Sequence, residues 1–209
     1  MSLTVSEPES SGFTPCPAGT YPARCVLIAD LGSQQSEYQG EIKHAHKLLA
    51  QFEITDPETR RDDGKPFTIN KRFTASLHEK AGLRKTLESW RGRPFSPEEL
   101  RGFNLQNVLG KPCLLSVVQE QKGDRTYSNI ASIMGLPKGM TCPEPSNTPA
   151  SFDLSNPDWE TFEALSERLQ EQIAESPEGR AAIAKRHTAA PGAPSTPAAD
   201  DFGDDDIPF

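Results

Sequence analysis

The chain has 209 residues, of which 34% are hydrophobic, and it carries 19 prolines and a formal net charge of −8. This length suits one domain of about 130 to 150 residues with appendages, and the low hydrophobic share indicates that part of the chain lies outside a packed core. No stretch approaches the roughly 20 apolar residues of a membrane span. The first residues lack the basic start and apolar run of a secretory signal, so we expect a cytoplasmic protein that does not associate with a membrane.

The net charge is an average over unlike parts of the chain. Residues 43–138 hold seventeen Lys or Arg and eleven Asp or Glu, a net charge of +6, whereas residues 200–209 hold five aspartates and no basic residue. Such an asymmetry points to a nucleic-acid partner. An ordinary solvated surface is the alternative explanation.

Few residues have the spacing of a metal or catalytic site. No C-x-x-C pair occurs among the four cysteines, so we expect reduced, partly buried thiols and no zinc site. His44 and His46 share one face of a strand but have no third ligand nearby. No arrangement of nucleophile, base and acid is visible, so the sequence predicts no enzyme, no cofactor and no metal. The cysteines are Cys16, Cys25, Cys113 and Cys142.

Strand signals dominate the first half of the chain. Runs rich in β-branched and apolar residues, separated by Gly, Pro and Asp, are typical of strands joined by turns. Residues 1–18 are rich in Ser, Glu and Pro and are expected to be flexible. We expect strands at 19–31, 46–55 and 67–76, a polar loop between the first two, and a hairpin tip at 56–66.

The hydrophobic period changes after residue 76. Residues 77–90 carry one apolar stripe at helical spacing, which predicts a helix with Trp90 in the core. Ser96 and Glu99 fit a capping box at the start of a second short helix over 96–103. Further strands are expected at 111–121 and 125–136.

The order of these elements predicts a mainly β protein. Five strands with a helix between the third and fourth is the layout of an OB-fold five-stranded barrel, expected here over residues 19–140. A linker at 141–155 leads to a C-terminal helical segment at 156–187. A second linker at 188–200 and a disordered acidic tail, whose tip is 201–209, complete the chain.

The C-terminal segment contains an amphipathic helix. Residues 156–176 begin with a capping signal and place apolar side chains on one face, which must dock on the barrel or on another subunit. Trp159 is therefore expected in a core. The stripe consists of Trp159, Phe162, Leu165, Leu169 and Ile173.

The ending "DDFGDDDIPF" resembles the acidic tip of bacterial single-stranded DNA-binding proteins, which end in an aspartate run and Ile-Pro-Phe. The segments "SLHEKAGLRKTLESWRGRPF", "LQNVLGKPCLLSVV" and "IMGLPKGM" are similar to phage-encoded proteins of single-stranded DNA binding or replication. The second resemblance covers roughly residues 19–140. Together they imply a protein of phage replication or recombination, acting in the cytoplasm of an infected bacterial cell.

In that bacterial family the tip recruits replication, recombination and repair enzymes of the host. Phe209 would fill an apolar pocket of the partner and its carboxylate would pair with a cation. The aspartates would steer the approach, and Pro208 would lower the ordering cost. A solubilising tail would explain the aspartates but not the apolar residues. The expected partner-docking residues are Asp204, Asp205, Asp206, Ile207, Pro208 and Phe209.

A barrel that holds single-stranded DNA needs cations for phosphates and exposed aromatic rings for bases. OB-folds bind over the second and third strands and the loops that flank them. The basic candidates are Lys43, Lys47, Arg60, Arg61, Lys65, Lys71, Arg72, Lys122 and Arg125. The aromatic candidates are Tyr38, Phe52, Phe67, Phe73 and Tyr127, although the alternation of the phenylalanines with polar residues places some of them in the core.

The sequence therefore predicts a protein that binds single-stranded DNA without sequence preference, protects it, and recruits host enzymes through its tip. Binding of RNA is open, because OB grooves accept both nucleic acids. The alternative is an interaction protein that mimics the host tip and sequesters repair enzymes without binding DNA. A homo-oligomer is compatible with the sequence, and a dimer is the favoured form.

Overall fold

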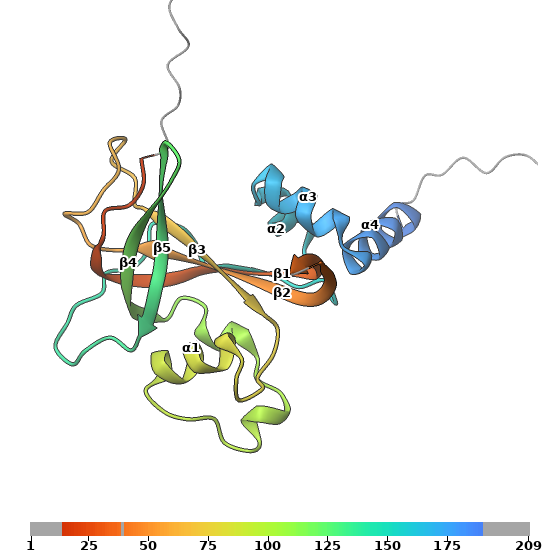
Figure 1. The fold of residues 1–209 in the computed structure, drawn as a ribbon, viewed down its shortest axis with the longest axis horizontal. Coiled ribbons are helices and arrows are strands. Elements are labelled where there is room, and N and C mark those ends of the chain that lie inside the picture. Colours follow the sequence, from red (N-terminus) through yellow and green to blue (C-terminus); the bar gives the residue numbers. More distant parts are fainter. Residues whose placement is uncertain (1–13, 39, 190–209) are drawn as a thin grey trace, which may run out of the picture.

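The computed structural model describes residues 14–38 and 40–189, without the side chains of residues 36–38 and 189 (Figure 1). The tip 201–209 and most of the linker 188–200 lie outside the described residues. The described chain is mainly β, with one six-stranded open sheet and four α-helices. The sequence order of three strands, a helix and two further strands is confirmed.

The main sheet has the order β3-β2-β1-β4-β5, and neighbouring strands along this path run antiparallel. A short sixth strand pairs parallel with β1. The strands are β1 (Gly19–Tyr38), β2 (Glu41–Ile54), β3 (Thr68–Thr74), β4 (Pro112–Lys122), β5 (Arg125–Met134) and β6 (Ala150–Phe152).

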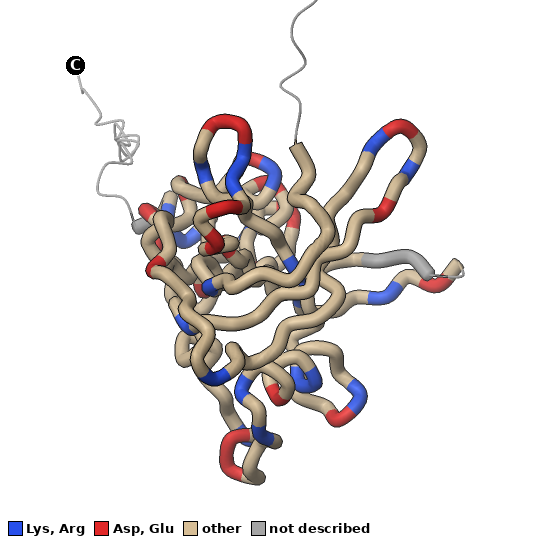
Figure 2. The backbone as a smooth tube through the Cα atoms, turned by 90° about the vertical axis from the view of Figure 1, so that its left-hand side faces the viewer, with Lys and Arg blue, Asp and Glu red and all other residues tan. Residues whose placement is uncertain are grey.

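The β1–β2 hairpin is much longer than expected. The segment predicted as a polar loop continues both strands, and Glu37 pairs with Ile42 near the tip. Polar residues on both faces hide a strand from a pattern search, because only a half-buried strand alternates. The register shifts between Asp30 and Gly32, where Gly32 adopts a φ of 68°. Figure 2 shows that this hairpin and the β4–β5 hairpin project to the same side of the molecule.

Two hydrophobic cores lie on opposite faces of the sheet. Residues of β1 belong to both cores. Its register shifts between Cys25 and Leu27. As a result, Cys25 and Ile28 belong to the first core, whereas Leu27 and Ala29 belong to the second. Figure 1 shows α1 next to the sheet on one side and α2 to α4 on the other.

The first core is closed by α1 (Gly82–Arg91) and two 3-10 turns, η1 (Glu99–Arg101) and η2 (Leu105–Val108). Leu83, Leu87 and Trp90 are buried, which confirms that Trp90 belongs to the core. The helix begins five residues later than predicted. The capping box is confirmed, since the Ser96 N–H donates to Glu99 Oε2 at 2.9 Å and the Glu99 N–H donates to Ser96 Oγ at 3.2 Å. In the structure this capping box precedes the 3-10 turn η1 and not the short helix predicted over 96–103.

The second core is covered by three helices: α2 (Trp159–Ala164), α3 (Glu167–Glu175) and α4 (Pro177–Ala189). The single helix predicted at 156–176 is wrong, because Leu165 and Ser166 adopt extended backbone angles and divide it. The predicted apolar stripe does dock on the sheet, where Leu169 and Ile173 pack in one cluster with Leu49. Trp159 is half-buried at the edge of that cluster.

The predicted linker 141–155 is packed against the sheet. It contains β6, and its backbone is held by the buried carboxylate of Glu53, which accepts hydrogen bonds from the N–H groups of Ser146 at 2.6 Å and Asn147 at 2.9 Å. The end of the predicted flexible segment 1–18 is also packed, because Cys16 is buried. None of the described helices has the length and apolar character needed to cross a membrane.

The four cysteines are free, as expected. Burial raises the pKa of Cys16 to about 11 and that of Cys25 to about 12, and it raises the pKa of Cys113 as well. These three thiols are therefore protonated at neutral pH and act as small apolar side chains.

Candidate nucleic-acid interface

The clearest cationic feature of the described surface is an open hollow between the end of β3, the segment 75–81 and the start of α1. It has a volume of about 690 Å³. Among the described residues, no carboxylate lines it. Its cations come from both β3 and the helical segment: Lys71, Arg72, Lys80 and Lys85, with His78 beside them.

Backbone groups add to this positive character. The first turn of α1 contains no acidic residue, and Ala81 at its N-cap offers no side-chain acceptor. The N-terminus of a helix carries a partial positive charge and exposed N–H groups, which favour anions. The hollow as a whole is therefore suited to anionic groups such as the phosphates of a nucleic acid.

Arg72 and Thr74 of the hollow also belong to a polar row on the face of β2 and β3 that the helical layer partly covers. Lys47 Nζ donates to Thr74 Oγ1 at 2.8 Å, and Gln51 Nε2 donates to Asn70 Oδ1 at 3.0 Å. Arg72 lies between these pairs and donates from Nη2 to Gln172 Oε1 on α3 at 2.9 Å. Lys47 and Arg72 are thus placed together, as the sequence predicted for two cations of one binding face.

Lys71 occupies the gap between β3 and β5. Its Nζ donates to the backbone carbonyl of Ile130 on β5 at 2.9 Å. The side chain is half-buried, and that burial lowers the pKa of Lys71. Lys71 therefore lines the hollow with its charge partly committed to a structural hydrogen bond.

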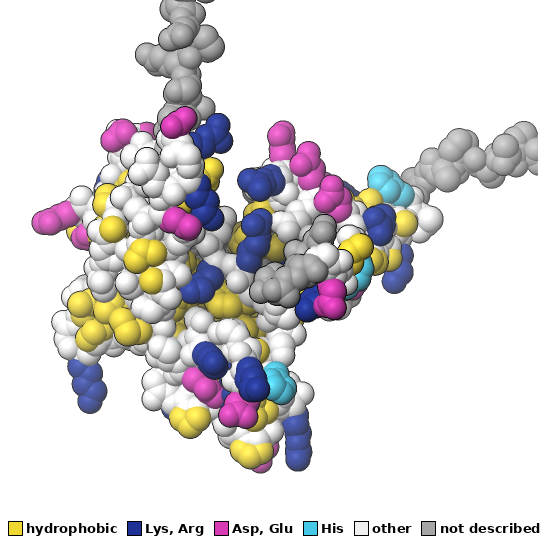
Figure 3. Space-filling model, in the orientation of Figure 1, with side chains coloured by type: hydrophobic (Ala, Val, Ile, Leu, Met, Phe, Trp, Pro, Cys, Tyr) yellow, Lys and Arg dark blue, Asp and Glu magenta, His cyan; other side chains and the backbone are white. Residues whose placement is uncertain are grey.

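The β4–β5 hairpin carries three of the predicted residues. Lys122 and Arg125 are cross-strand partners next to its turn, and Tyr127 is 41% exposed. Lys122 Nζ lies 3.5 Å from Glu120 Oε2, and this ion pair makes Lys122 less available to a phosphate group. Figure 3 shows Lys and Arg side chains on both sides of the depression between this hairpin and the helical layer, and again over the segment that joins β3 to α1.

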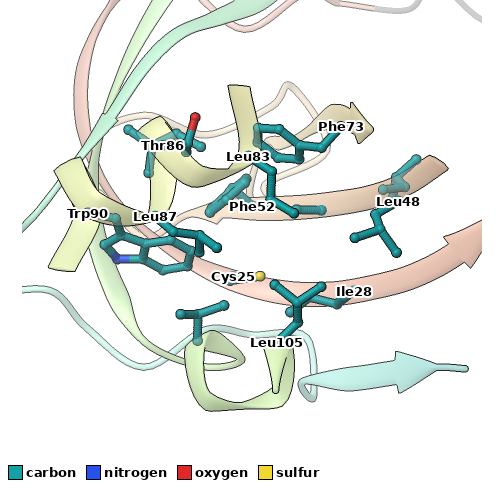
Figure 4. A pocket seen from close by; sticks show the side chains of 14 residues that line it. Cys25, Ile28, Leu48, Phe52, Phe73, Leu83, Thr86, Leu87, Trp90 and Leu105 are labelled. Carbon is teal, nitrogen blue, oxygen red and sulfur yellow. The ribbon is translucent and has the colours of Figure 1, made fainter. Parts of the chain in front are cut away.

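The three phenylalanine candidates are corrected by the structure. Phe52, Phe67 and Phe73 are 1%, 6% and 8% exposed, so their rings cannot stack on a base without unfolding the core. Figure 4 shows Phe52 and Phe73 directed toward Leu83, Leu87 and Trp90 around an apolar cavity. The alternation along β3 correctly separated two faces: Phe73 and Ile69 lie on the packed face together with the half-buried Lys71, and Arg72 lies on the opposite, exposed face.

The loop 56–66 is a poor source of positive charge. It contains three bases and four acids, and Arg61 Nε lies 3.3 Å from Asp63. The loop precedes β3, whereas the cationic hollow lies at the far end of that strand. Arg60, Arg61 and Lys65 are therefore not brought together with Lys71 and Arg72.

Two candidates lie on the β1–β2 hairpin. Lys43 is exposed and Nζ lies 3.3 Å from Glu41. Tyr38 is near the tip, and its side chain is outside the described part of the structure. Both residues belong to the β1–β2 hairpin, which projects to the same side as the β4–β5 hairpin in Figure 2.

His46 of the predicted histidine pair makes structural contacts. His46 Nε2 lies 2.6 Å from Asp30 Oδ1, and Nδ1 lies 3.9 Å from Glu178 on α4. Glu178 also accepts hydrogen bonds from the N–H and hydroxyl groups of Ser33, at 2.9 and 2.6 Å. These contacts join α4 to the β1–β2 hairpin. Among the described residues, no group of three potential metal ligands is found.

Sequence reasoning missed His78, Lys80 and Lys85. The signal was present, since Lys80 and Lys85 fall off the apolar stripe of the helix predicted at 77–90 and must face water. What the pattern could not give is the turn over 75–81 that carries them beside β3. No protein-family model matches this chain, and no curated protein matches it.

Proposed function

We propose that this protein binds single-stranded DNA without sequence preference, across the exposed end of β3 and the start of α1. The observation that carries the proposal is the hollow lined by Lys71, Arg72, Lys80 and Lys85, to which the described part of the chain contributes no carboxylate. Its cations would contact phosphates, which gives affinity without reading sequence. Tyr127 is the predicted aromatic candidate that is exposed and available for stacking.

The topology supports the choice of ligand. An antiparallel sheet in the order β3-β2-β1-β4-β5, with a helix between β3 and β4, has the connectivity that we expect of an OB-fold barrel. We propose that β3 and β5 are the two edges that approach to close such a barrel, with Lys71 between them. The binding face of OB-folds includes β3 and the β4–β5 loop, which are the regions that carry the cations here.

The helical layer limits the extent of this face. Leu49 on β2 is fully buried beneath α2 to α4, so part of the outer surface of the second strand is covered. The proposed path for a strand therefore runs from the β4–β5 hairpin over β3 to α1, and not across β1 and β2.

The acidic tip would then recruit partner proteins in phage replication or recombination, as its resemblance to bacterial single-stranded DNA-binding proteins implies. Its aspartates would steer it to a basic surface and Phe209 would supply the apolar contact. In a pull-down from a bacterial lysate, Phe209→Ala should lose the partners retained by the unaltered chain. Retention of the same partners by Phe209→Ala would contradict the docking role.

A titration by fluorescence anisotropy tests the DNA-binding proposal. Labelled oligo-dT and a duplex of equal length are compared at two salt concentrations. We expect tighter binding of the single strand and a steep loss of affinity with salt. Absence of binding to either form would favour the alternative, an interaction protein that captures host enzymes through its tip. A preference for oligo-U would instead indicate an RNA ligand.

A further inference from the structure

A second hollow lies at the opposite end of α1, between the helix and the start of β4. Its volume is about 330 Å³, near the lower limit of roughly 300 to 1,000 Å³ that is usual for sites of small ligands. Arg91, Arg93 and Lys111 line it together with the apolar side chains of Trp90 and Phe103. None of these residues lines the hollow at β3.

Arg91 is held rigidly in the wall of this hollow. Its guanidinium lies 4.5 Å from the ring centre of Phe95 and 5.0 Å from that of Phe103. Its Nη2 donates to Glu99, whereas its Nη1 is buried and makes no hydrogen bond to any described residue. A buried donor without an acceptor is costly, so Arg91 keeps a desolvated and incompletely paired positive charge in the wall of the hollow.

The charge of the hollow defines the acceptor. Three cations line it against one carboxylate, Glu99, which leaves a net charge of +2. Hydrogen bonds from Arg93, the Ser96 N–H and Arg91 hold the pKa of Glu99 at about 2, so Glu99 is ionised at neutral pH. A phosphate monoester carries a charge of about −1.5 to −2 at pH 7 and three strong acceptor oxygens.

We propose that this second hollow binds the phosphate monoester of a nucleotide. The phosphate would contact Arg91, Arg93 and Lys111, and the sugar and base would lie against the apolar lining beside Phe103. Asn107 at the rim offers an amide for a base edge. The nucleotide is either a free mononucleotide or the 5′-phosphorylated end of a strand. The site does not depend on strand binding at β3, because it uses different residues.

Tryptophan fluorescence provides a local readout of this site. The chain has two tryptophans, Trp90 in the lining and Trp159 in the other core, so Trp159→Phe leaves Trp90 as the reporter. Titrating this variant with dTMP should change the emission of Trp90 to saturation, whereas thymidine at the same concentrations should not. The response to dTMP should weaken below pH 6, as the phosphate dianion takes up a proton and becomes a monoanion.

Two exposed cations separate ligand binding from folding. Arg93→Gln and Lys111→Gln should each weaken dTMP binding about tenfold or more, since each removes a charge-assisted contact. Arg101→Gln removes an exposed cation of the same segment that does not line the hollow, and it should bind like the parent. Arg91→Met should abolish binding, with circular dichroism as the check on its fold.

Oligo-dT with and without a 5′-phosphate distinguishes the two sources of the ligand. A response to dTMP assigns the site to free nucleotides, and a response only to the phosphorylated strand assigns it to strand ends. No response of Trp90 to either phosphate monoester would overturn the proposal. A change in Trp90 emission that is the same in Arg93→Gln and Lys111→Gln as in the parent would also overturn the proposal. Neither result would bear on strand binding at β3, which oligo-dT anisotropy measures separately.

Discussion

Lys71 on β3 donates a hydrogen bond from Nζ to the backbone carbonyl oxygen of Ile130 on β5, at 2.9 Å. These strands are the two ends of the main sheet path, and no backbone ladder between them is found in the described structure. One side chain therefore both bridges the open edge of the sheet and lines the cationic hollow.

Lys71→Met separates these two roles. It removes a hydrogen bond but also the cost of burying a charge, and the two effects oppose each other at about 1 kcal/mol each. We expect the midpoint of thermal unfolding to move by less than about 4 °C and the affinity for oligo-dT to fall several-fold. A large loss of stability would mean that the bridge is chiefly structural.

The lowered pKa of Lys71 gives this comparison a pH dependence. A base whose pKa is lowered by folding destabilises the fold while it is protonated, and that cost is relieved as pH rises through the folded pKa toward its ordinary value of 10.5. The stability of the unaltered chain relative to Lys71→Met should therefore increase between neutral and alkaline pH. Urea unfolding at several pH values measures the difference.

Glu53 is the buried anchor of the segment 141–155. Its carboxylate is 1% exposed and accepts three hydrogen bonds, from the Ser146 N–H, the Asn147 N–H and Asn147 Nδ2. Glu53→Ala should lower the free energy of unfolding by about 2 to 4 kcal/mol, because it leaves these donors unpaired. The exposed Glu58 supplies the control, since Glu58→Ala should change stability by less than about 0.5 kcal/mol. Equal effects of the two changes in urea unfolding would contradict the anchoring role.

Ile173 tests the docking of the helical layer on the sheet. It is fully buried in the core that α3 shares with β1 and β2. Ile173→Ala should destabilise the protein by about 2 to 5 kcal/mol in a single cooperative transition. The exposed Glu171 on the same helix is the matched position, and Glu171→Ala should have little effect. A separate low-temperature transition confined to Ile173→Ala would show that the helices unfold independently of the sheet.

The stability of the contact between α4 and β1 depends on pH, because Glu178 must be ionised to make it. The hydroxyl and backbone N–H of Ser33 hold the pKa of Glu178 at about 2, below its ordinary value of 4.5. A carboxylate with a depressed pKa stabilises the fold above its unfolded value and loses that contribution as pH falls through its folded value. Glu178→Gln should lower the unfolding temperature at pH 7, modestly because the side chain is partly exposed. The difference should vanish between about pH 4.5 and 2, and a constant difference would contradict the assignment.

Much of the fold could be predicted from the sequence, because strand and helix periods are local properties. The order of the elements, the Ser96–Glu99 capping box and the burial of Trp90 are confirmed. The length of the β1–β2 hairpin could not be predicted, since Gln34, Gln35 and Ser36 carry no hydrophobic pattern and are placed by cross-strand pairing and, for Gln34, by hydrogen bonds with Gln172 on α3. The interruption between α2 and α3 at Ser166 could not be predicted either, because the helical spacing of apolar residues continues across it.

The candidate site was predicted only in part. Arg72 was identified correctly as a cation on the exposed face of β3, whereas the alternation alone would place Lys71 with the packed residues Ile69 and Phe73. Phe52, Phe67 and Phe73 were misassigned, since alternation separates the two faces of a strand without saying which face is packed. Lys80 and Lys85 were missed because their position beside β3 depends on tertiary structure.

The most direct test of the account is the salt dependence of single-strand binding by a variant of the hollow. In Arg72→Gln/Lys80→Gln/Lys85→Gln the logarithm of the binding constant for oligo-dT should fall less steeply with the logarithm of salt concentration. About 0.7 is expected per lost phosphate contact, and so about 2 in all. The control Arg101→Gln/Arg180→Gln/Lys185→Gln removes the same charge from exposed positions elsewhere and should keep the original slope. Equal slopes and affinities for the two variants would contradict the claim that single-stranded DNA binds at β3 and α1.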